Sequence, residues 1–167
     1  ADVERTLETP LLGTVPKLEG RTPAEALSDR KSAMLEAYLA VQTNLEFSSD
    51  HGVPRSLSIT STRPAEGKST SAFAIALSLS RAKRRVVLID GDLRSPSVHR
   101  VLGMSNDRGF SNLLAGSDDF DAALRATSHE HLSVMTSGPL PPNAAELLTG
   151  DRLEYILQAL LTRFDNV

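Results

Sequence analysis

The sequence contains no cysteine and no tryptophan, and only 4% of its 167 residues are aromatic. The absence of cysteine excludes disulfides, thiolate zinc sites and cysteine nucleophiles, and it suits a reducing compartment. No stretch approaches 18 consecutive apolar residues, and the N-terminus lacks the basic-then-apolar pattern of a signal peptide. We therefore expect neither a membrane span nor an export signal within these residues. The 18 basic and 21 acidic side chains argue against a general nucleic-acid binder.

Hydrophobic residues make up 40% of the chain, so the core must be mostly aliphatic. A chain of this length can bury roughly 70% of its unfolded surface without a disulfide or metal. The two tyrosines, Tyr38 and Tyr155, both fall on predicted helix faces, and we expect them to pack there. The composition therefore predicts a soluble globular domain.

Charges and prolines dominate residues 1–30, which we interpret as a tether in which only the run 11–15 is able to pack. The remainder, 31–167, alternates helix-like and strand-like segments. Helices are predicted at 32–47, 68–82, 97–102, 110–114, 121–126, 143–148 and 151–164, and strands at 57–59, 86–89 and 132–134. The alternation predicts an α/β fold, with a parallel sheet covered by helices on both faces.

The turn before the predicted helix 68–82 has the composition of a phosphate-binding loop. Polyphosphate requires converging backbone N–H groups, a positive helix end, one long cation and a hydroxyl that reaches magnesium. Gly67 allows close backbone approach, Lys68 supplies the cation, and Ser69 supplies the hydroxyl. Thr62 stands where the standard pattern has its first glycine. The predicted nucleotide-binding set is Ser61, Thr62, Ala65, Glu66, Gly67, Lys68, Ser69 and Thr70.

Two carboxylates, Asp90 and Asp92, follow the buried strand 86–89. At the carboxyl end of a parallel strand they lie at the sheet edge where α/β folds bind ligands. There they can hold magnesium with Ser69 or take a proton from an attacking hydroxyl. By itself the pattern fits a capped turn with a surface ion pair equally well. The nearby phosphate loop favours the magnesium interpretation.

Residues 54–102 resemble the bacterial tyrosine kinases of capsule and exopolysaccharide export, the BY-kinases, which belong to the ParA/MinD-like P-loop ATPases. Residues 61–70 match their Walker A motif, and 87–94 match Walker A′, three aliphatic residues followed by Asp-x-Asp-x-Arg. Further segments resemble family landmarks at 2–16, 36–45, 109–116 and 138–148. The resemblance therefore covers nearly the whole chain.

The resemblance implies ATP-dependent autophosphorylation of tyrosines in a C-terminal tail, coupled to control of polymer length. It implies that Lys68 stabilises phosphate charge, Ser69 ligates Mg²⁺, Asp90 and Asp92 serve Mg²⁺ and the tyrosine hydroxyl, and Arg94 orients the second carboxylate. The implied location is the cytoplasmic face of the bacterial inner membrane. The implied partner is a polysaccharide co-polymerase membrane segment, on the same chain or another, and no nucleic acid.

Three departures from the family pattern set the remaining expectations. Residues 164–167 resemble the start of the Walker B strand, so we expect a domain truncated before Walker B that lacks its last strands. The tyrosine-rich tail is also missing, and little catalysis is expected from these residues alone. A homo-oligomer is implied, but Leu39 and Gln42 replace the arginines that follow Glu36 in the ring-assembly motif. Two alternatives stay open, a ParA/MinD-like ATPase without a tyrosine substrate and a non-catalytic nucleotide-binding regulatory module.

Overall fold

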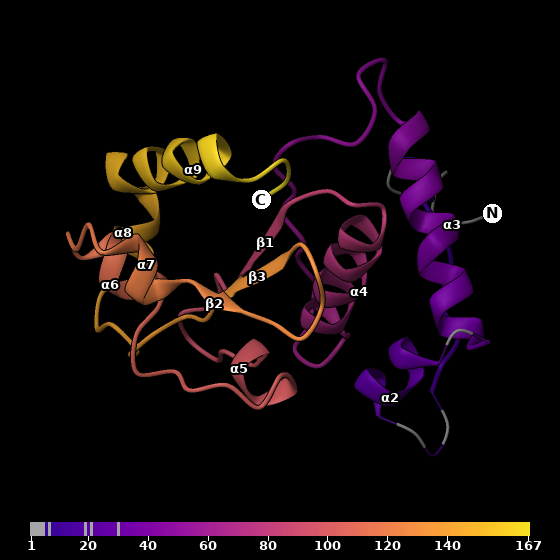
Figure 1. Ribbon diagram of the computed structural model, residues 1–167, viewed down its shortest axis with the longest axis horizontal. Coiled ribbons are helices and arrows are strands. Elements are labelled where there is room, and N and C mark those ends of the chain that lie inside the picture. The colour runs from indigo at the N-terminus through magenta and orange to yellow at the C-terminus, as the bar shows by residue number, and fades with distance from the viewer. Residues whose placement is uncertain (1–5, 7, 19, 21, 30) are drawn as a thin grey trace. The chain divides into compact units, whose positions relative to one another are not determined.

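The computed structural model describes residues 6, 8–18, 20, 22–29 and 31–167, and its chain divides into two compact units, Ala1–Pro54 and Arg55–Val167 (Figure 1). The predicted tether, 1–30, falls within the first unit, and its residues 1–5, 7, 19, 21 and 30 lie outside the described residues. The boundary between the two compact units thus lies after Pro54. That residues 1–30 form a tether that follows a membrane segment stays a prediction.

In the first unit, the described residues include the helices α2 (Pro23–Ser28) and α3 (Ala33–Phe47) and a segment without regular structure before them. This segment packs on α3, where the side-chain amide of Asn44 donates to the carbonyl oxygen of Leu12 at 2.7 Å. Gly13 lies so close to this helix that a Cβ would meet Cγ2 of Val41 at 2.7 Å. Within the run 11–15, Leu12 and Gly13 therefore contact α3, whereas Leu11 and Val15 are exposed, and the predicted tether also contains a helix.

The predicted ring-assembly positions lie on α3. Glu36 is exposed, and Leu39 is an exposed large hydrophobic residue with 45% of its surface accessible. Gln42 is partly buried. Without arginines at the second and third positions, α3 lacks the bidentate donors that pair with carboxylates across an interface. Oligomerisation stays a prediction.

The second unit is built on a three-stranded sheet in the order β1-β3-β2. Its elements are α4 (Lys68–Arg81), β1 (Val86–Ile89), α5 (Val98–Val101), α6 (Phe110–Leu114), α7 (Phe120–Ala123), β2 (Arg125–Ala126), β3 (Leu132–Met135), α8 (Ala144–Thr149) and α9 (Asp151–Arg163). Strands β1 and β3 are parallel, with Val86 opposite Leu132. The predicted α/β fold is confirmed. The helix expected at 121–126 instead ends at Ala123, because the next residues pair antiparallel with β3.

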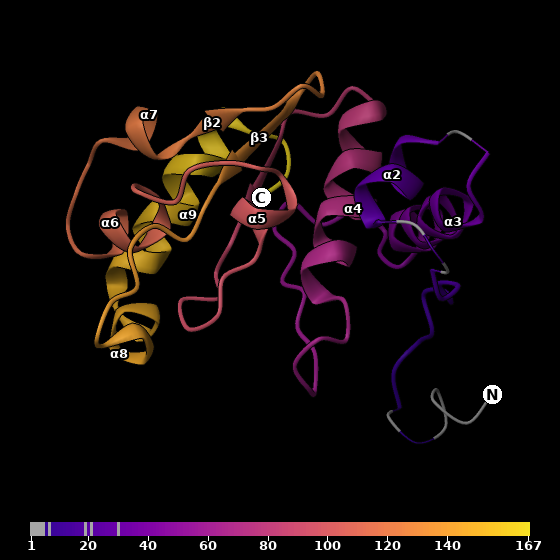
Figure 2. The same ribbon diagram turned by 90° about the horizontal axis from the view of Figure 1, so that it is seen from below.

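Helices cover both faces of the β1 and β3 strands (Figures 1 and 2). Helix α4 lies on one side, and α9 lies on the other with α6. Val87 of β1 joins the aliphatic cluster that contains Ile156 and Leu160 of α9, and all three are at most 1% exposed. Since side chains alternate along a strand, the neighbouring Val86 and Leu88 face the opposite layer. The buried run predicted for β1 is thus confirmed.

The C-terminal residues lie between β1 and the segment that leads into the phosphate loop. The backbone of Val167 exchanges hydrogen bonds with Arg55 and Leu57, while Asn166 bridges to Val86 in parallel. The strand expected at 57–59 is not formed, and the N–H of Leu57 instead donates to the carbonyl oxygen of Val167 at 2.9 Å. Residues 166 and 167 therefore lie between β1 and residues 55–57, and that they begin a Walker B strand stays a prediction.

An ion pair fixes this C-terminal segment to the start of β1. The guanidinium of Arg85 approaches the carboxylate of Asp165 at 2.7 Å, and the backbone N–H of Arg85 donates to the same carboxylate at 2.8 Å. These bonds lower the pKa of Asp165 from its usual value to about 2. Because both side chains are exposed, the pair adds little to overall stability. We infer that it fixes the alignment of the C-terminal segment with β1.

The two tyrosines differ in environment. Tyr38 is 3% exposed, which confirms its predicted packing role. Tyr155 on α9 is 50% exposed, with the guanidinium carbon of Arg152 4.7 Å from its ring centroid and Phe120 beside it.

Among the residues that the structure describes, no helix has both the length and the apolar character needed to cross a membrane.

Candidate functional site

The phosphate loop, residues 61–70, turns sharply into the N-terminus of α4. Gly67 adopts φ +86° and Ala65 adopts φ +63°, in the left-handed region that favours glycine. The first helical N–H that finds a backbone acceptor is that of Ser71, which donates to the carbonyl oxygen of Gly67 at 2.8 Å. Within the described part of the chain, the N–H groups of residues 68–70 have no recorded partner. These donors at a positive helix end form an anion-binding position.

Glu66 holds the first half of this loop. Its carboxylate accepts hydrogen bonds from the backbone N–H groups of Thr62 and Arg63, each at 3.0 Å, and from the Thr62 hydroxyl at 3.1 Å. The Arg63 N–H, followed by the Thr62 hydroxyl, holds the pKa of Glu66 below its usual value. Glu66 therefore closes the loop on itself, whereas its sequence position indicated only nucleotide contact. The hydroxyl of Thr62, where the common pattern has glycine, takes part in this closure.

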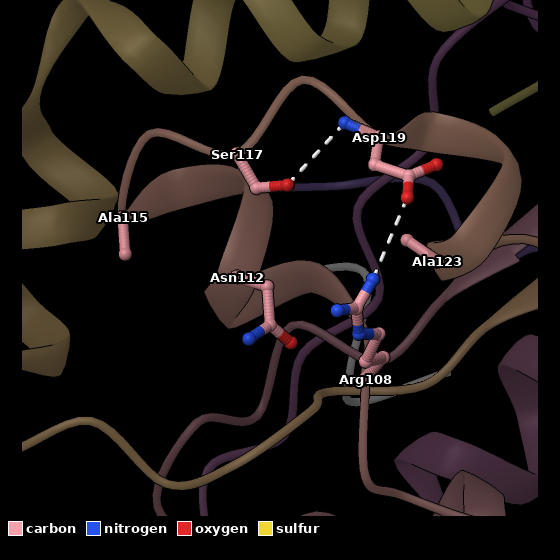
Figure 3. A pocket seen from close by; sticks show the side chains of 6 residues that line it. All are labelled: Arg108, Asn112, Ala115, Ser117, Asp119 and Ala123. Carbon is pink, nitrogen blue, oxygen red and sulfur yellow. Dashed lines mark hydrogen bonds and ion pairs between the residues drawn. The ribbon is translucent and has the colours of Figure 1, made fainter.

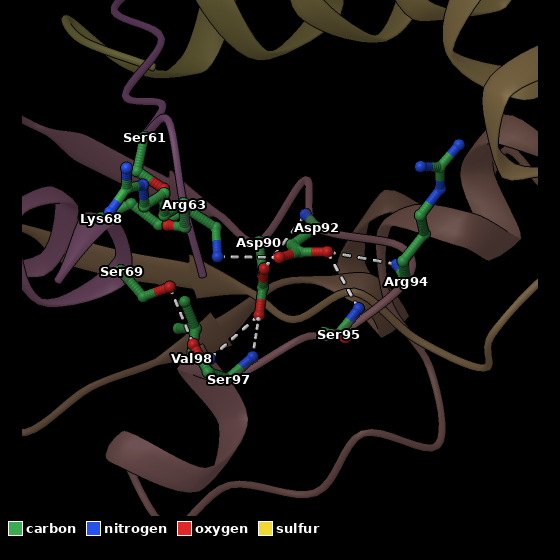
Figure 4. A network of polar contacts seen from close by, with 10 residues as sticks. All are labelled: Ser61, Arg63, Lys68, Ser69, Asp90, Asp92, Arg94, Ser95, Ser97 and Val98. Atoms are coloured by element: carbon green, nitrogen blue, oxygen red, sulfur yellow. Dashed lines mark hydrogen bonds and ion pairs between the residues drawn. The ribbon is translucent and has the colours of Figure 1, made fainter. Parts of the chain in front are cut away.

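The second half of the site is the carboxylate turn, which we define as residues 90–98 (Figure 4). Asp90 is 3% exposed, and both of its oxygens accept backbone hydrogen bonds. One oxygen accepts the N–H of Asp92 at 3.2 Å, and the other accepts the N–H groups of Ser97 and Val98 at 3.0 and 2.9 Å. The first carboxylate is thus built into the turn, and it also caps the start of α5.

The second carboxylate, that of Asp92, faces the phosphate loop. Its Oδ2 lies 2.8 Å from the Lys68 ammonium, and its Oδ1 accepts the backbone N–H groups of Arg94 and Ser95. The Lys68 side chain, followed by the Ser95 N–H, holds the pKa of Asp92 below its usual value. Asp92 is thus charged at neutral pH and shared between the loop and the turn.

Arg94 contacts this carboxylate differently from the role that the resemblance implies. Its backbone N–H donates to Asp92 at 3.2 Å, while its guanidinium points away from the carboxylates in Figure 4. The side chain lines a separate cavity of about 520 Å³ with Leu140, Pro141 and Pro142. In this arrangement Arg94 orients the second carboxylate through its backbone.

A second contact joins the loop to the turn. The hydroxyl of Ser97 donates to the hydroxyl of Ser69 at 2.8 Å (Figure 4). Ser97 was not among the residues that sequence patterns singled out. The available signal was its position directly before α5, where a serine commonly caps a helix. The structure instead directs this side chain toward the phosphate loop.

Four of the predicted residues, Lys68, Ser69, Asp90 and Asp92, line a cavity of about 680 Å³. They form its polar end, and the remainder is lined largely by apolar side chains of β1, α4 and residues 56–60, while the other predicted residues lie outside its lining. A smaller cavity of about 290 Å³ lies apart from it, beside α6 and α7, and includes Arg108 and Asp119, which pair at 3.4 Å (Figure 3). This second cavity contains none of the predicted site residues.

The donor atoms at the polar end fit magnesium. Mg²⁺ prefers oxygen ligands, and it is usually held by one or two carboxylates together with substrate phosphates rather than by a dedicated protein cage. Ser69 and Asp92 supply a hydroxyl and a carboxylate, and the buried Asp90 lies behind them. Among the described residues, no group of three His, Cys, Asp or Glu side chains is arranged to hold a metal. The site therefore suits a cation that arrives with a phosphate ligand.

Comparison with known proteins agrees with this geometry. Residues 52–165 match the model of the ParA family, described as NUBPL iron-transfer P-loop NTPases. The chain is 37% identical over 142 residues to the tyrosine-protein kinase YwqD of Bacillus subtilis, a match that covers 85% of this chain and 60% of that protein. It is 30% identical to the Escherichia coli tyrosine-protein kinase etk, covering 87% of this chain and 20% of that protein.

Solved structures extend the likeness to the whole chain. The kinase domain of the Escherichia coli tyrosine kinase ETK superposes with a TM-score of 0.89 at 26% identity, covering 99% of this chain and 69% of that one. The tyrosine kinase domain of BceF gives 0.86 at 30% identity, covering 99% and 72%. The cell-division ATPase MinD of Pyrococcus furiosus gives 0.57 at 26% identity, covering 67% and 47%.

Proposed function

Because the chain belongs to the ParA family of P-loop NTPases, in the branch of the bacterial tyrosine kinases, we propose that it is the ATP-binding part of a protein-tyrosine kinase. The proposed reaction transfers the γ-phosphoryl group of ATP, bound with Mg²⁺, to tyrosine. One observation carries the proposal: the fold brings Lys68 and Ser69 against Asp92 and Ser97, at 2.8 Å in both pairs. These contacts bring a cation, a hydroxyl and a carboxylate close together, which supports a single phosphate position between them.

The phosphate loop performs the binding step. The N–H groups of residues 68–70 face the phosphates. The Lys68 ammonium has three N–H donors, so it can donate to phosphate as well as to Asp92. Magnesium, when bound, neutralises charge that develops on the phosphates, and Ser69 and Asp92 are the residues that would hold it. Catalysis of this kind relies on positioning and electrostatics rather than on a covalent enzyme intermediate.

The carboxylate turn performs the proton step. As the tyrosine oxygen bonds to the γ-phosphorus, the bond from that phosphorus to the β,γ-bridging oxygen breaks and ADP leaves. The tyrosine hydroxyl proton passes to Asp92, whose ionised carboxylate is partly exposed and so within reach of a substrate hydroxyl. Asp90 is buried with both oxygens bonded to backbone N–H groups, and we assign it the role of holding the turn.

The biological setting follows from the family resemblance. We propose that the whole protein acts with a polysaccharide co-polymerase membrane segment at the cytoplasmic face of the bacterial inner membrane. The chain spans 60% of the Bacillus relative and 20% of the Escherichia coli one, so the acceptor tyrosines and the Walker B strand are expected elsewhere in the whole protein.

A ParA/MinD-like ATPase is the second candidate, and the family model supports it. The kinase domains superpose over 99% of the chain with TM-scores of 0.86 to 0.89, whereas MinD covers 67% at 0.57. This difference favours the kinase. A regulatory module that binds nucleotide without chemistry is the third candidate, and no specific observation favours it.

The test uses the whole protein with its C-terminal tail and γ-labelled ATP. We expect labelled phosphotyrosine from the wild type, and a loss of about 10²–10⁴-fold in transfer rate for Asp92→Asn, the range for removal of a positioned proton acceptor. Release of labelled inorganic phosphate without phosphotyrosine would establish the ATPase instead. Nucleotide binding without either product would establish the regulatory module.

A further inference from the structure

We propose that Ser97 is a positioning residue that orients the Ser69 hydroxyl toward magnesium. The inference rests on the proposed binding of ATP with Mg²⁺, and it assigns a role to a residue outside the Walker A and A′ blocks. Ser97 and Ser69 are 28 positions apart in the sequence, and the fold brings their hydroxyl oxygens to 2.8 Å. The contact is partly buried, and Ser69 itself lines the large cavity.

The backbone of Ser97 is fixed independently of the phosphate loop. Its N–H donates to Oδ2 of Asp90 at 3.0 Å, and the next N–H, that of Val98, donates to the same oxygen at 2.9 Å. Asp90 is 3% exposed and Val98 is 4% exposed. The Ser97 hydroxyl therefore projects from a rigid turn toward Ser69, a partly buried side chain in the first turn of α4.

The chemistry of two hydroxyl groups makes this contact relevant to a metal. Each hydroxyl carries one hydrogen and two lone pairs, so the hydrogen bond between Ser69 and Ser97 can run in either direction. In the structure Ser97 donates to Ser69. When a cation takes a lone pair of Ser69, the Ser69 hydrogen must point away from it. The Ser97 oxygen lies where it can accept that hydrogen.

The consequence is specific to the metal-bound state. Without the Ser97 hydroxyl, Ser69 must turn its hydrogen to water, and the ligand atom loses its preferred orientation. Outer partners of this kind tune metal affinity about 10-fold to 100-fold in other proteins. ATP without metal needs only the Lys68 ammonium and the loop N–H groups. Removal of the hydroxyl should therefore weaken the magnesium-dependent part of ATP affinity and leave the metal-free part unchanged.

The experiment measures the affinity of the 167-residue chain for a non-hydrolysable ATP analogue by calorimetry, once with excess Mg²⁺ and once with EDTA. The readout is the affinity with Mg²⁺ divided by the affinity in EDTA. We expect this ratio to fall about tenfold in Ser97→Ala, while the affinity in EDTA changes less than twofold. Ser97→Thr keeps the hydroxyl and should retain the wild-type ratio. Ser97→Val has the shape of threonine without the hydroxyl, and it should behave like alanine.

The control is Ser128→Ala, which removes an exposed serine hydroxyl outside the site, and it should leave both affinities unchanged. In a Ser69→Ala background, removal of the Ser97 hydroxyl should have no further effect on the ratio, because coupled residues are not additive. Equal weakening with and without Mg²⁺, or loss of the ratio in Ser97→Thr, would show a purely structural role and overturn the inference. If the wild type binds the analogue but Ser97→Ala and Ser97→Val match it, the inference alone fails. If the wild type binds no nucleotide, the proposed function fails with it.

Discussion

The phosphate loop and the carboxylate turn are both ordered by carboxylates that accept backbone N–H groups, but the two carboxylates differ in burial. The loop, 61–70, is largely exposed, and its first half is held by one exposed carboxylate, that of Glu66. The turn, 90–98, is built around Asp90, a buried carboxylate that accepts three backbone N–H groups. The loop leaves donors free for a ligand, whereas the turn uses its polar groups internally.

The difference indicates a division of labour between the two regions. The rigid turn supplies fixed reference points, and the exposed loop supplies the atoms that contact a ligand. Two contacts of 2.8 Å, Lys68 with Asp92 and Ser69 with Ser97, hold these two loop side chains in position relative to the turn. Variants in the loop should therefore change ligand affinity, and variants at the buried carboxylate should change stability.

The largest expected effect on ligand affinity comes from Lys68→Ala. The variant removes the one long cation of the loop, and we expect ATP affinity to fall about 100-fold, the range for a lost hydrogen bond to a charged group. Calorimetric titration with ATP and Mg²⁺ gives the affinity, and the thermal midpoint of the free protein serves as the control for folding. An ATP affinity equal to that of the wild type would contradict the assignment of the loop.

The next effect separates the two carboxylates. Asp90→Asn places an amide N–H₂ against backbone N–H donors in a buried position, so we expect the free energy of unfolding to fall by about 1–3 kcal/mol. Asp92→Asn makes the same chemical change at a more exposed group and should cost less than about 1 kcal/mol. Urea denaturation of both variants measures the difference. Equal losses of stability would remove the distinction between a buried carboxylate and a shared one.

A smaller effect is expected from Glu66→Ala. Its carboxylate holds the N–H groups of Thr62 and Arg63, so its removal should loosen the loop before the ligand arrives. We expect ATP affinity to fall about two- to fivefold through lost preorganisation, with the unfolding midpoint unchanged. Tighter binding of ATP by the variant would mean that charge repulsion between Glu66 and phosphate outweighs the ordering of the loop.

The smallest effect concerns pH. Lys68 and the Ser95 N–H lower the pKa of Asp92 in the folded protein, so the stabilisation from this carboxylate is complete above its unfolded pKa of about 4. It is lost as pH falls through the lower folded value. Urea unfolding at decreasing pH should show a steeper loss in the wild type than in Asp92→Asn, which cannot titrate there. If the wild type gained stability relative to Asp92→Asn on acidification, the Asp92 carboxylate would be destabilising, which would contradict this prediction.

Local patterns were sufficient to predict the elements that build the site. The run 86–89 followed by Asp90 and Asp92 indicated a buried strand and a polar turn, and both are present. The helix that starts at Lys68 was predicted from Gly67 and the loop before it. These features depend on periodicity, glycine conformation and helix ends, which short segments encode.

Features that depend on tertiary contacts were not predictable in this way. Strand β2 has two residues and exists because it pairs with β3, so no propensity indicates it. The closure of the loop by Glu66 and the outward direction of Arg94 depend on side-chain rotamers. The contact between Ser69 and Ser97 joins two segments that only the folded sheet edge brings together.

Hydrogen exchange of individual amides, followed by NMR with and without ATP and Mg²⁺, tests the division between loop and turn most directly. The amides of Ser97 and Val98, bonded to buried Asp90, should exchange slowly in both states. The amides of residues 68–70 should exchange quickly in the free protein and become protected when the nucleotide binds. An absence of protection at 68–70, or fast exchange at Ser97 and Val98 in the free protein, would contradict the assignment of ligand contact to the loop and rigidity to the turn.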